Sequence, residues 1–413
     1  MNKKMILHIL ADSVLLSGVM SSVSADMAFA MIPNENREQM QDGRGMPFGG
    51  GFGSPNMGRS DMGSQNMNSQ NMAEEPGEIK SGPIENSASV LEADIADAKY
   101  ITVSETENRV KIEEPGTYVI SGSSSDGSIT VKKGTTGVVL VLEDLDLASS
   151  TGAPLSFNKG TEVKVLISGT VTLTDAENAA DEFSADTETA DSYDGAALKI
   201  KADSAVYITG EGTLNLIGKA KNGIKGGDNA SLILDGPAIS IAAVNDGVNM
   251  IYDLTILSGS VSINAGDDAL HADHILTIGT GDESGLVIYV AQCSEGIEAE
   301  VVNIFGGNIT LNASDDAINA AYKNGTNTPS INMTGGDVTI NGQGDGFDSN
   351  GNINLIGGSA VINTQYRGGE AGIDYDGAYY ISDSFQMNNT GGVSGPDSMG
   401  GGQGRGRGGW GRP

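Results

Sequence analysis

Two nearly identical stretches, "NAGDDALHAD" at residues 264–273 and "NASDDAINAA" at residues 312–321, begin 48 residues apart. Each places two adjacent aspartates before a small residue and an apolar residue. Related text recurs along the chain, with the small residue at Gly223, Gly247, Ala269, Gly296, Ala317 and Gly346. The spacings are 24, 22, 27, 21 and 29 residues. Periods of roughly 20 to 50 residues are typical of solenoids.

Within each repeat, apolar residues alternate with polar ones, which indicates strands with one buried face. The first alternating pairs are Leu232/Leu234, Leu254/Ile256, Leu276/Ile278, Val302/Ile304, Ile331/Met333 and Ile353/Leu355. A glycine-containing turn then leads into a further pair, such as Val261/Ile263 or Val338/Ile340. No repeat carries the 3.6-residue apolar stripe of a helix. Three short strands in each repeat predict an all-β fold, a parallel β-helix.

Composition divides the chain into four parts. Residues 1–30 are typical of a signal peptide, with Lys3 and Lys4 before an apolar run and small residues at its end. Residues 31–90 form a low-complexity linker rich in Met, Gly, Asn and Gln. Residues 91–388 hold the predicted β-helix, and residues 389–413 form a flexible Gly/Arg-rich tail. We expect a secreted or cell-surface protein with disordered N- and C-terminal tails, which could associate with the cell surface.

The charge balance restricts the partners. The chain has 54 Asp and Glu residues against 23 Lys and Arg residues, a formal net charge of −31. Nucleic acids and anionic membranes are disfavoured as partners because phosphate binding needs a basic surface. No second apolar run is long enough for a membrane span. Cations, or ligands held through cations, are favoured.

In a β-helix, equivalent residues of successive coils stack about 4.8 Å apart. Stacking would bring five acidic residues to one corner: Asp246, Asp268, Glu295, Asp316 and Asp345. Asp267 and Asp315 would add second carboxylates, with Asp348 nearby. Two such charges repel by roughly 3 to 4 kcal/mol at an effective dielectric constant of 20. Hard oxygen ligands of this kind suit calcium. The alternative is a solvated acidic edge whose repulsion is screened by water and salt.

Two further patterns concern polar side chains. The last strand of several repeats ends in an asparagine, at Asn264, Asn312, Asn341 and Asn363. Stacked on a turn, these residues could join their side-chain amides in a ladder. His271 and His274 are three residues apart in a predicted strand, so their side chains should lie on opposite sides. A histidine metal site is therefore not expected.

The segments "NGIKGGDNASLIL", "DDALHAD", "EGIEAEVVNIFGGNITL" and "SDDAINAA" resemble a bacterial family of secreted carbohydrate-binding domains. That family's right-handed parallel β-helix is similar to that of calcium-dependent pectate lyases. The resemblance implies binding of plant cell-wall polysaccharide, either cellulose or a pectin-like polymer. It also implies that Asp246, Asp267, Asp268, Glu295, Asp315, Asp316 and Asp345 bind calcium. Ala269 and Ala317 stand where the family's corner has glycine.

Three functions remain open. The sequence favours a non-catalytic binder in which calcium bridges the acidic protein to acidic sugars. A calcium-dependent polyuronate lyase is the alternative, and it would need a basic residue to remove a proton. Lys225 in "NGIKGGDN" is the best candidate for that base, although a surface lysine on a turn is the favoured interpretation of this residue. The third option is a solenoid that serves as a surface adhesin or spacer.

Overall fold

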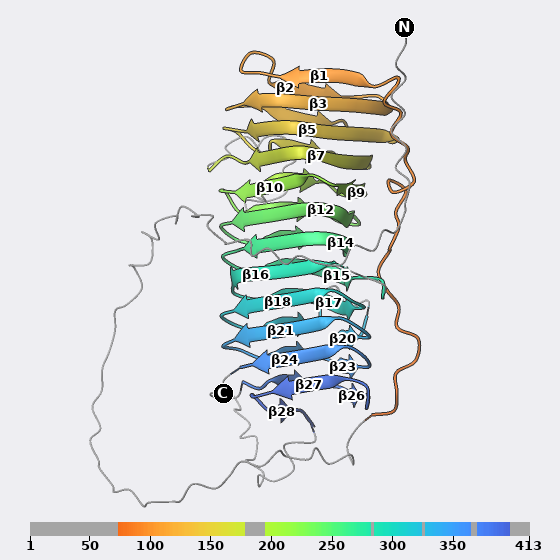
Figure 1. Ribbon diagram of the computed structural model, residues 1–413, viewed down its shortest axis with the longest axis vertical. Coiled ribbons are helices and arrows are strands. Elements are labelled where there is room, and N and C mark those ends of the chain that lie inside the picture. The colour runs from red at the N-terminus through yellow and green to blue at the C-terminus, as the bar shows by residue number, and fades with distance from the viewer. Residues whose placement is uncertain (1–72, 178–194, 282–284, 324–326, 365–369, 397–413) are drawn as a thin grey trace, which may run out of the picture. The chain divides into compact units, whose positions relative to one another are not determined.

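A computed structural model describes residues 73–177, 195–281, 285–323, 327–364 and 370–396. In these residues the chain forms strands and turns that wind into coils stacked along one axis (Figure 1). Strands of adjacent coils pair in parallel, as β12 and β14 or β18 and β21 do. The predicted all-β parallel β-helix is confirmed. No helix in the described residues is long and apolar enough to cross a membrane.

The coils build three faces. Face 1 holds β2 (Arg109–Ile112), β4 (Ser128–Val131), β6 (Leu155–Phe157), β8 (Ala196–Ile200), β11 (Asn222–Gly226), β13 (Val248–Met250), β19 (Ile318–Ala320), β22 (Phe347–Ser349), β25 (Ile373–Tyr375) and β28 (Val393–Ser394). Face 2 holds β1 (Lys99–Val103), β9 (Ala205–Gly210), β20 (Ser330–Met333), β23 (Asn352–Leu355) and β26 (Tyr379–Ile381). Face 3 holds β10 (Thr213–Gly218), β16 (Val287–Cys293), β18 (Asn308–Ala313), β21 (Asp337–Gly342), β24 (Ser359–Asn363) and β27 (Gln386–Asn389).

Several longer strands run around a corner from one face to the next. Faces 1 and 2 share β15 (Leu270–Ile278) and β17 (Ile297–Ile304). Faces 2 and 3 share β3 (Gly116–Ser124), β5 (Val138–Ala148), β7 (Glu162–Thr174), β12 (Ser231–Ala243) and β14 (Asp253–Asn264). On face 1 the last strand, β28, pairs with β25. The solenoid therefore continues through β28, beyond the predicted boundary at residue 388.

The alternating apolar residues form continuous ridges inside the coils. One ridge on face 2 contains Leu232, Leu254, Leu276, Val302, Ile331 and Ile353, each paired with its equivalent one coil away. All of them are buried in one connected core. Each such side chain contributes roughly 1.5 to 3 kcal/mol by leaving water. Burial of one strand face therefore fixes the register, because a one-residue shift would turn the whole ridge outward.

Close packing explains the glycines that follow the acidic corner. A Cβ atom on Gly247 would lie 2.5 Å from the carbonyl oxygen of Ala269. The backbone φ angles at Gly247 and Gly296 are not in the positive range, and neither are those at Ala269 and Ala317. The two alanines therefore bring no left-handed backbone strain to their corners.

Residues 73–98, which we name the N-terminal segment, lie along face 2 (Figure 1). The Ala73 amide donates to the Tyr379 carbonyl at 3.0 Å, near the last coil. The Gly82 amide donates to Thr277 Oγ1 at 3.0 Å, and Asn303 Nδ2 donates to the Lys80 carbonyl at 3.2 Å. Residues 73–90 fall within the predicted linker, yet they are bound to the solenoid.

Other predictions fall outside the described residues. These are the signal peptide at residues 1–30, the Met-rich part of the linker up to residue 72, and the tail from residue 397 onward.

Candidate functional site

Backbone hydrogen bonds place the acidic residues at one corner of successive coils, where face 3 turns into face 1. The Gly247 amide donates to the Asp268 carbonyl at 2.9 Å, and the Ala269 amide donates to the Glu295 carbonyl at 2.9 Å. The same pattern continues from Gly296 to Asp316 and from Ala317 to Asp345. The predicted stack of Asp246, Asp268, Glu295, Asp316 and Asp345 is therefore present in the structure.

Several of these side chains also bind the next coil. Asp246 Oδ1 accepts the Asp268 amide at 3.2 Å, and Asp316 Oδ1 accepts the Asp345 amide at 2.6 Å. Asp345 Oδ1 accepts the amide of Ala371. Each of these carboxylates thus satisfies one backbone donor that the turn would otherwise leave unpaired.

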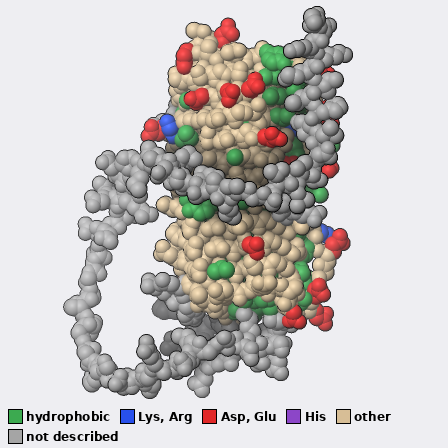
Figure 2. Space-filling model, in the orientation of Figure 1, with side chains coloured by type: hydrophobic (Ala, Val, Ile, Leu, Met, Phe, Trp, Pro, Cys, Tyr) green, Lys and Arg blue, Asp and Glu red, His purple; other side chains and the backbone are tan. Residues whose placement is uncertain are grey.

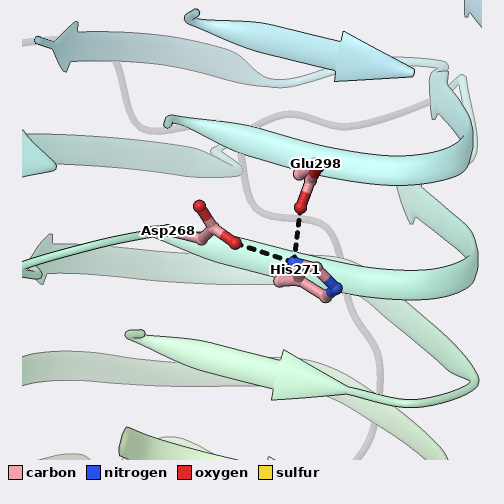
Figure 3. Close-up of side chains that lie close together, drawn as sticks. All are labelled: Asp268, His271 and Glu298. Carbon is pink, nitrogen blue, oxygen red and sulfur yellow. Dashed lines mark hydrogen bonds and ion pairs between the residues drawn. The ribbon is translucent and has the colours of Figure 1, made fainter. Parts of the chain in front are cut away.

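One cluster at the corner contains its own cation. His271 Nδ1 lies 2.7 Å from Asp268 Oδ2 and 2.7 Å from Glu298 Oε2, as Figure 3 shows. His271 Nε2 lies 2.8 Å from Asp273 Oδ1, and Lys323 Nζ pairs with Glu298. Both ring nitrogens therefore face carboxylate oxygens, an arrangement that suits a doubly protonated ring.

The pKa values agree with this assignment. Burial lowers the pKa of His271, but the hydrogen bonds that its ring donates to Asp268, Asp273 and Glu298 outweigh this effect and raise that pKa to about 11. Burial raises the pKa of Glu298, and the bonds from His271 and Lys323 bring it down to about 2. A protonated imidazole has no lone pair for a metal. The imidazolium and ammonium groups therefore offset two of the three negative charges of this cluster.

A second cluster, nearer the C-terminus, contains no such cation among the residues that the structure describes. Asp316, Asp345 and Glu370 bring one oxygen each within 4.8 Å of one another, and so do Asp345, Asp348 and Asp374. Within the described residues, none of these five carboxylates pairs with Lys, Arg or His. Asp345 belongs to both groups of three. We name these five residues the unpaired cluster.

The unpaired cluster resists full ionisation. Burial and the neighbouring carboxylates raise the pKa of Asp345 to about 7, and they raise that of Asp348 to about 7. The pKa of Asp316 is raised as well, again mainly by burial. At neutral pH the folded chain therefore retains protons here, or takes up positive charge from solution. On the face shown in Figure 2, acidic side chains are spread over the surface and basic ones are few.

The donor set fits calcium. All five residues of the unpaired cluster offer carboxylate oxygens, the ligands of hard divalent cations, and calcium accepts six to eight oxygens in flexible geometry. A cation would also relieve the repulsion that raises the carboxyl pKa values. Asp316, Asp345, Asp348, Glu370 and Asp374 are the residues that would hold it.

The sequence of the solenoid matches that of a known protein family. The family of carbohydrate-binding domain-containing proteins matches residues 106–282 and 283–395, which together span most of the solenoid. The chain belongs to this family. The predicted family resemblance is thereby confirmed, although the match says nothing specific of calcium-dependent pectate lyases.

No curated protein matches the chain. Among solved structures, a gadolinium derivative of the polysaccharide lyase-like protein from C. thermocellum is similar at 23% sequence identity and a TM-score of 0.42. That alignment covers 69% of this chain and 92% of the other.

The predicted ligand residues of this carbohydrate-binding domain separate into groups. Asp316, Asp345 and Asp348 lie in the unpaired cluster, whereas Asp268 pairs with His271. Asp246 accepts hydrogen bonds from the side-chain amides of Asn245 and Asn249. Glu295 accepts one from Asn319 Nδ2 at 3.1 Å. Asp267 and Asp315, the first members of the two doublets, are exposed beside the stack.

Sequence reasoning missed His271, Glu298, Glu370 and Asp374. A signal for three of them exists, because each is the polar residue that follows the apolar residue of the repeat, as in "DALH", "EGIE" and "AGID". His271 pairs with Glu298, and Asp348 pairs with Asp374, at one register position of face 1. His274 lies apart and contacts Asp253 Oδ1 at 2.6 Å. The two histidines thus belong to separate clusters.

Lys225, the candidate base, shares that register position on face 1. Its Nζ donates to Asn249 Oδ1 at 2.7 Å. Five coil steps separate it from Asp348, through Asn249, His271, Glu298 and Asn319. At about 4.8 Å per step, the separation is roughly 24 Å. Lys225 therefore lies too far from the unpaired cluster to remove a proton from a ligand held there.

Proposed function

We propose that this protein is an exported, non-catalytic carbohydrate-binding protein that holds acidic plant cell-wall polysaccharide through calcium. The observation that carries the proposal is the unpaired cluster. Asp345, Asp348 and Asp374 come within ion-binding distance of one another, and no basic side chain in the described chain compensates them.

Electrostatics gives the reason for a bridging cation. A protein of net charge −31 repels a polyuronate, whose own carboxylates are negative. Calcium on the unpaired cluster would reverse the local sign, and its remaining coordination positions could accept sugar carboxylates and hydroxyls. Membership of a carbohydrate-binding family supports a sugar polymer as the ligand. A cation held by the acidic cluster would favour polymers that carry negative charge.

The basic residues argue for binding without cleavage. Eliminative cleavage needs a base beside the calcium-bound sugar, but Lys225 is roughly 24 Å away by coil steps. Lys323, the next lysine along the chain, pairs with Glu298. Of these two described lysines, one is thus distant from the unpaired cluster and the other is held by a buried carboxylate.

The test is binding of oligogalacturonate by isothermal titration calorimetry, with calcium and with chelator. We expect binding only with calcium, and its loss in the double variant Asp345→Asn/Asp348→Asn. Asp383→Asn removes an exposed carboxylate elsewhere and should bind as the parent chain does. Circular dichroism would establish that each protein is folded under assay conditions. Equal affinity in the presence of chelator would sink the bridging mechanism.

A further inference from the structure

A groove of about 400 Å³ opens on the turn that follows face 3. Its polar lining comes mainly from five amide side chains: Gln292, Asn312, Asn341, Gln343 and Asn363. Ala291, Ala313 and Cys293 add apolar surface, and among the described residues no charged side chain lines it. The volume lies at the low end of the roughly 300 to 1,000 Å³ usual for small-molecule sites.

The asparagines form the predicted ladder, which fixes their orientation. Asn363 Nδ2 donates to Asn341 Oδ1 at 3.1 Å, and Asn341 Nδ2 donates to Asn312 Oδ1 at 3.0 Å. Asn312 Nδ2 in turn donates to the Val290 carbonyl at 2.7 Å. A side-chain amide has two N–H donors and an oxygen with two lone pairs. Asn341 therefore keeps one donor and one lone pair beyond its ladder bonds.

An irregularity in β16 forms one end of the groove. Ile263 of β14 pairs with Val290, but the next residue, Asn264, pairs with Gln292, so that Ala291 is an extra residue. The shift puts a glutamine at the register position where other coils carry asparagine. Bulges of this kind redirect side chains and are frequent beside functional sites. Here the bulge interrupts the asparagine ladder and leaves the longer Gln292 side chain exposed at the groove.

We propose that this groove binds an uncharged, hydroxyl-rich sugar residue without a metal ion. Sugar hydroxyls both donate and accept hydrogen bonds, as the amide side chains do, so the two sets are complementary. The exposed apolar surface of Ala291 suits the C–H face of a sugar ring. The absence of charged lining among the described residues favours a neutral unit over a uronate. The inference uses the family's ligand class and does not depend on the proposed calcium site.

The test is affinity electrophoresis of the chain in native gels that contain one neutral polysaccharide each: hydroxyethyl cellulose, glucomannan or galactomannan. Chelator is present throughout, at a temperature where circular dichroism shows a folded chain. We expect retardation by at least one of these polymers. The double variant Gln292→Ala/Gln343→Ala should weaken it about tenfold, since two side chains that can hydrogen-bond the sugar are removed.

Both glutamines are exposed, so their removal should leave the fold intact. Gln386→Ala, a matched amide deletion on face 3 outside the groove lining, should be retarded as the parent chain is. Unchanged retardation of the double variant, or no retardation of the parent chain by any neutral polymer, would overturn the proposal. A gel containing polygalacturonate and calcium reports on the other site. Retardation there that disappears with chelator, while neutral retardation persists, separates the two mechanisms.

Discussion

Asp348 and Asp374 occupy the same register position of adjacent coils on face 1, and neither has a basic partner in the described part of the chain. Two and three coil steps from Asp348 toward the N-terminus, Glu298 and His271 pair at that position as a carboxylate and an imidazolium. Successive coils thus place side chains of different charge at the same register position of face 1. At one level a cation of the protein pairs with the carboxylate, whereas at the other level, in the described residues, the carboxylates hold protons or would take up a cation from solution.

Calcium should stabilise the folded chain. A ligand that binds only the folded state adds about 2.7 kcal/mol to the free energy of unfolding at one hundred times its dissociation constant. We therefore expect the melting temperature to rise with calcium and to fall after chelation. Asp345→Asn/Asp348→Asn should abolish that response, whereas Asp383→Asn should keep it. Differential scanning calorimetry measures the effect, and an identical melt with and without calcium would contradict it.

The calcium-free chain should lose stability as the pH rises from about 4 to about 7. In the unfolded chain Asp titrates near 3.9, whereas burial and neighbouring carboxylates raise the folded pKa of Asp345 and of Asp348 to about 7. Between these values the folded state holds more protons, so the free energy of unfolding falls with rising pH. Chemical denaturation across this range should show the decline. Calcium, or Asp345→Asn/Asp348→Asn, should make the decline shallower, although Asp316 and Glu295, whose pKa values are also raised, keep part of it. An equally steep decline in that variant would show that other groups hold the protons.

Removing the built-in cation should destabilise the corner. His271→Ala leaves Asp268 and Glu298 buried with one positive partner fewer, and loss of one member of a buried ion pair typically costs about 3 to 5 kcal/mol. We expect calcium to restore more stability to this variant than to the parent chain, because a divalent ion can replace the imidazolium. Thermal melts with and without calcium measure both effects. A calcium response no larger than that of the parent would exclude such replacement.

The contact between the N-terminal segment and face 2 should contribute to stability. Thr277→Val keeps the side-chain shape but removes the oxygen that accepts the Gly82 amide. A buried donor left without a partner costs about 1 to 3 kcal/mol. Thr339→Val, on an outward position of face 3, serves as the control. Urea denaturation compares the two, and equal stabilities would show that the segment does not depend on this bond.

The repeat made the fold predictable. Leu254 and Leu276 stack because each strand must bury one face. The alternation of apolar and polar residues within a single short strand is enough to show which face that is. The acidic stack followed from the same register. Glu370 could not be anticipated in this way, because it lies on the turn that follows residues 365–369, where the "DDA" text is absent. Nor could the sequence distinguish the level at which His271 pairs with carboxylates from the level that has no basic partner in the described part of the chain.

The N-terminal segment was also unpredictable, for a different reason. Its text, "AEEPGEIKSGPIENSASV" at residues 73–90, has the composition of a linker. Its order comes from outward-facing side chains of the solenoid, such as Thr255, which donates to the Pro83 carbonyl at 2.8 Å. The residues that order the segment therefore belong to the solenoid surface, and the segment's own sequence does not reveal them.

That segment changes how the solenoid should come apart. Repeat proteins behave as one-dimensional arrays in which each unit feels only its neighbours, so their ends fray independently. Here one stretch of chain contacts both the last coils, through Ala73 and Tyr379, and an early one, through Asp94 and Thr117. Distant units therefore share a common restraint, and opening either end disturbs contacts that run along the array. The consequence is long-range cooperativity, with hydrogen exchange at the two ends coupled through residues that belong to no repeat.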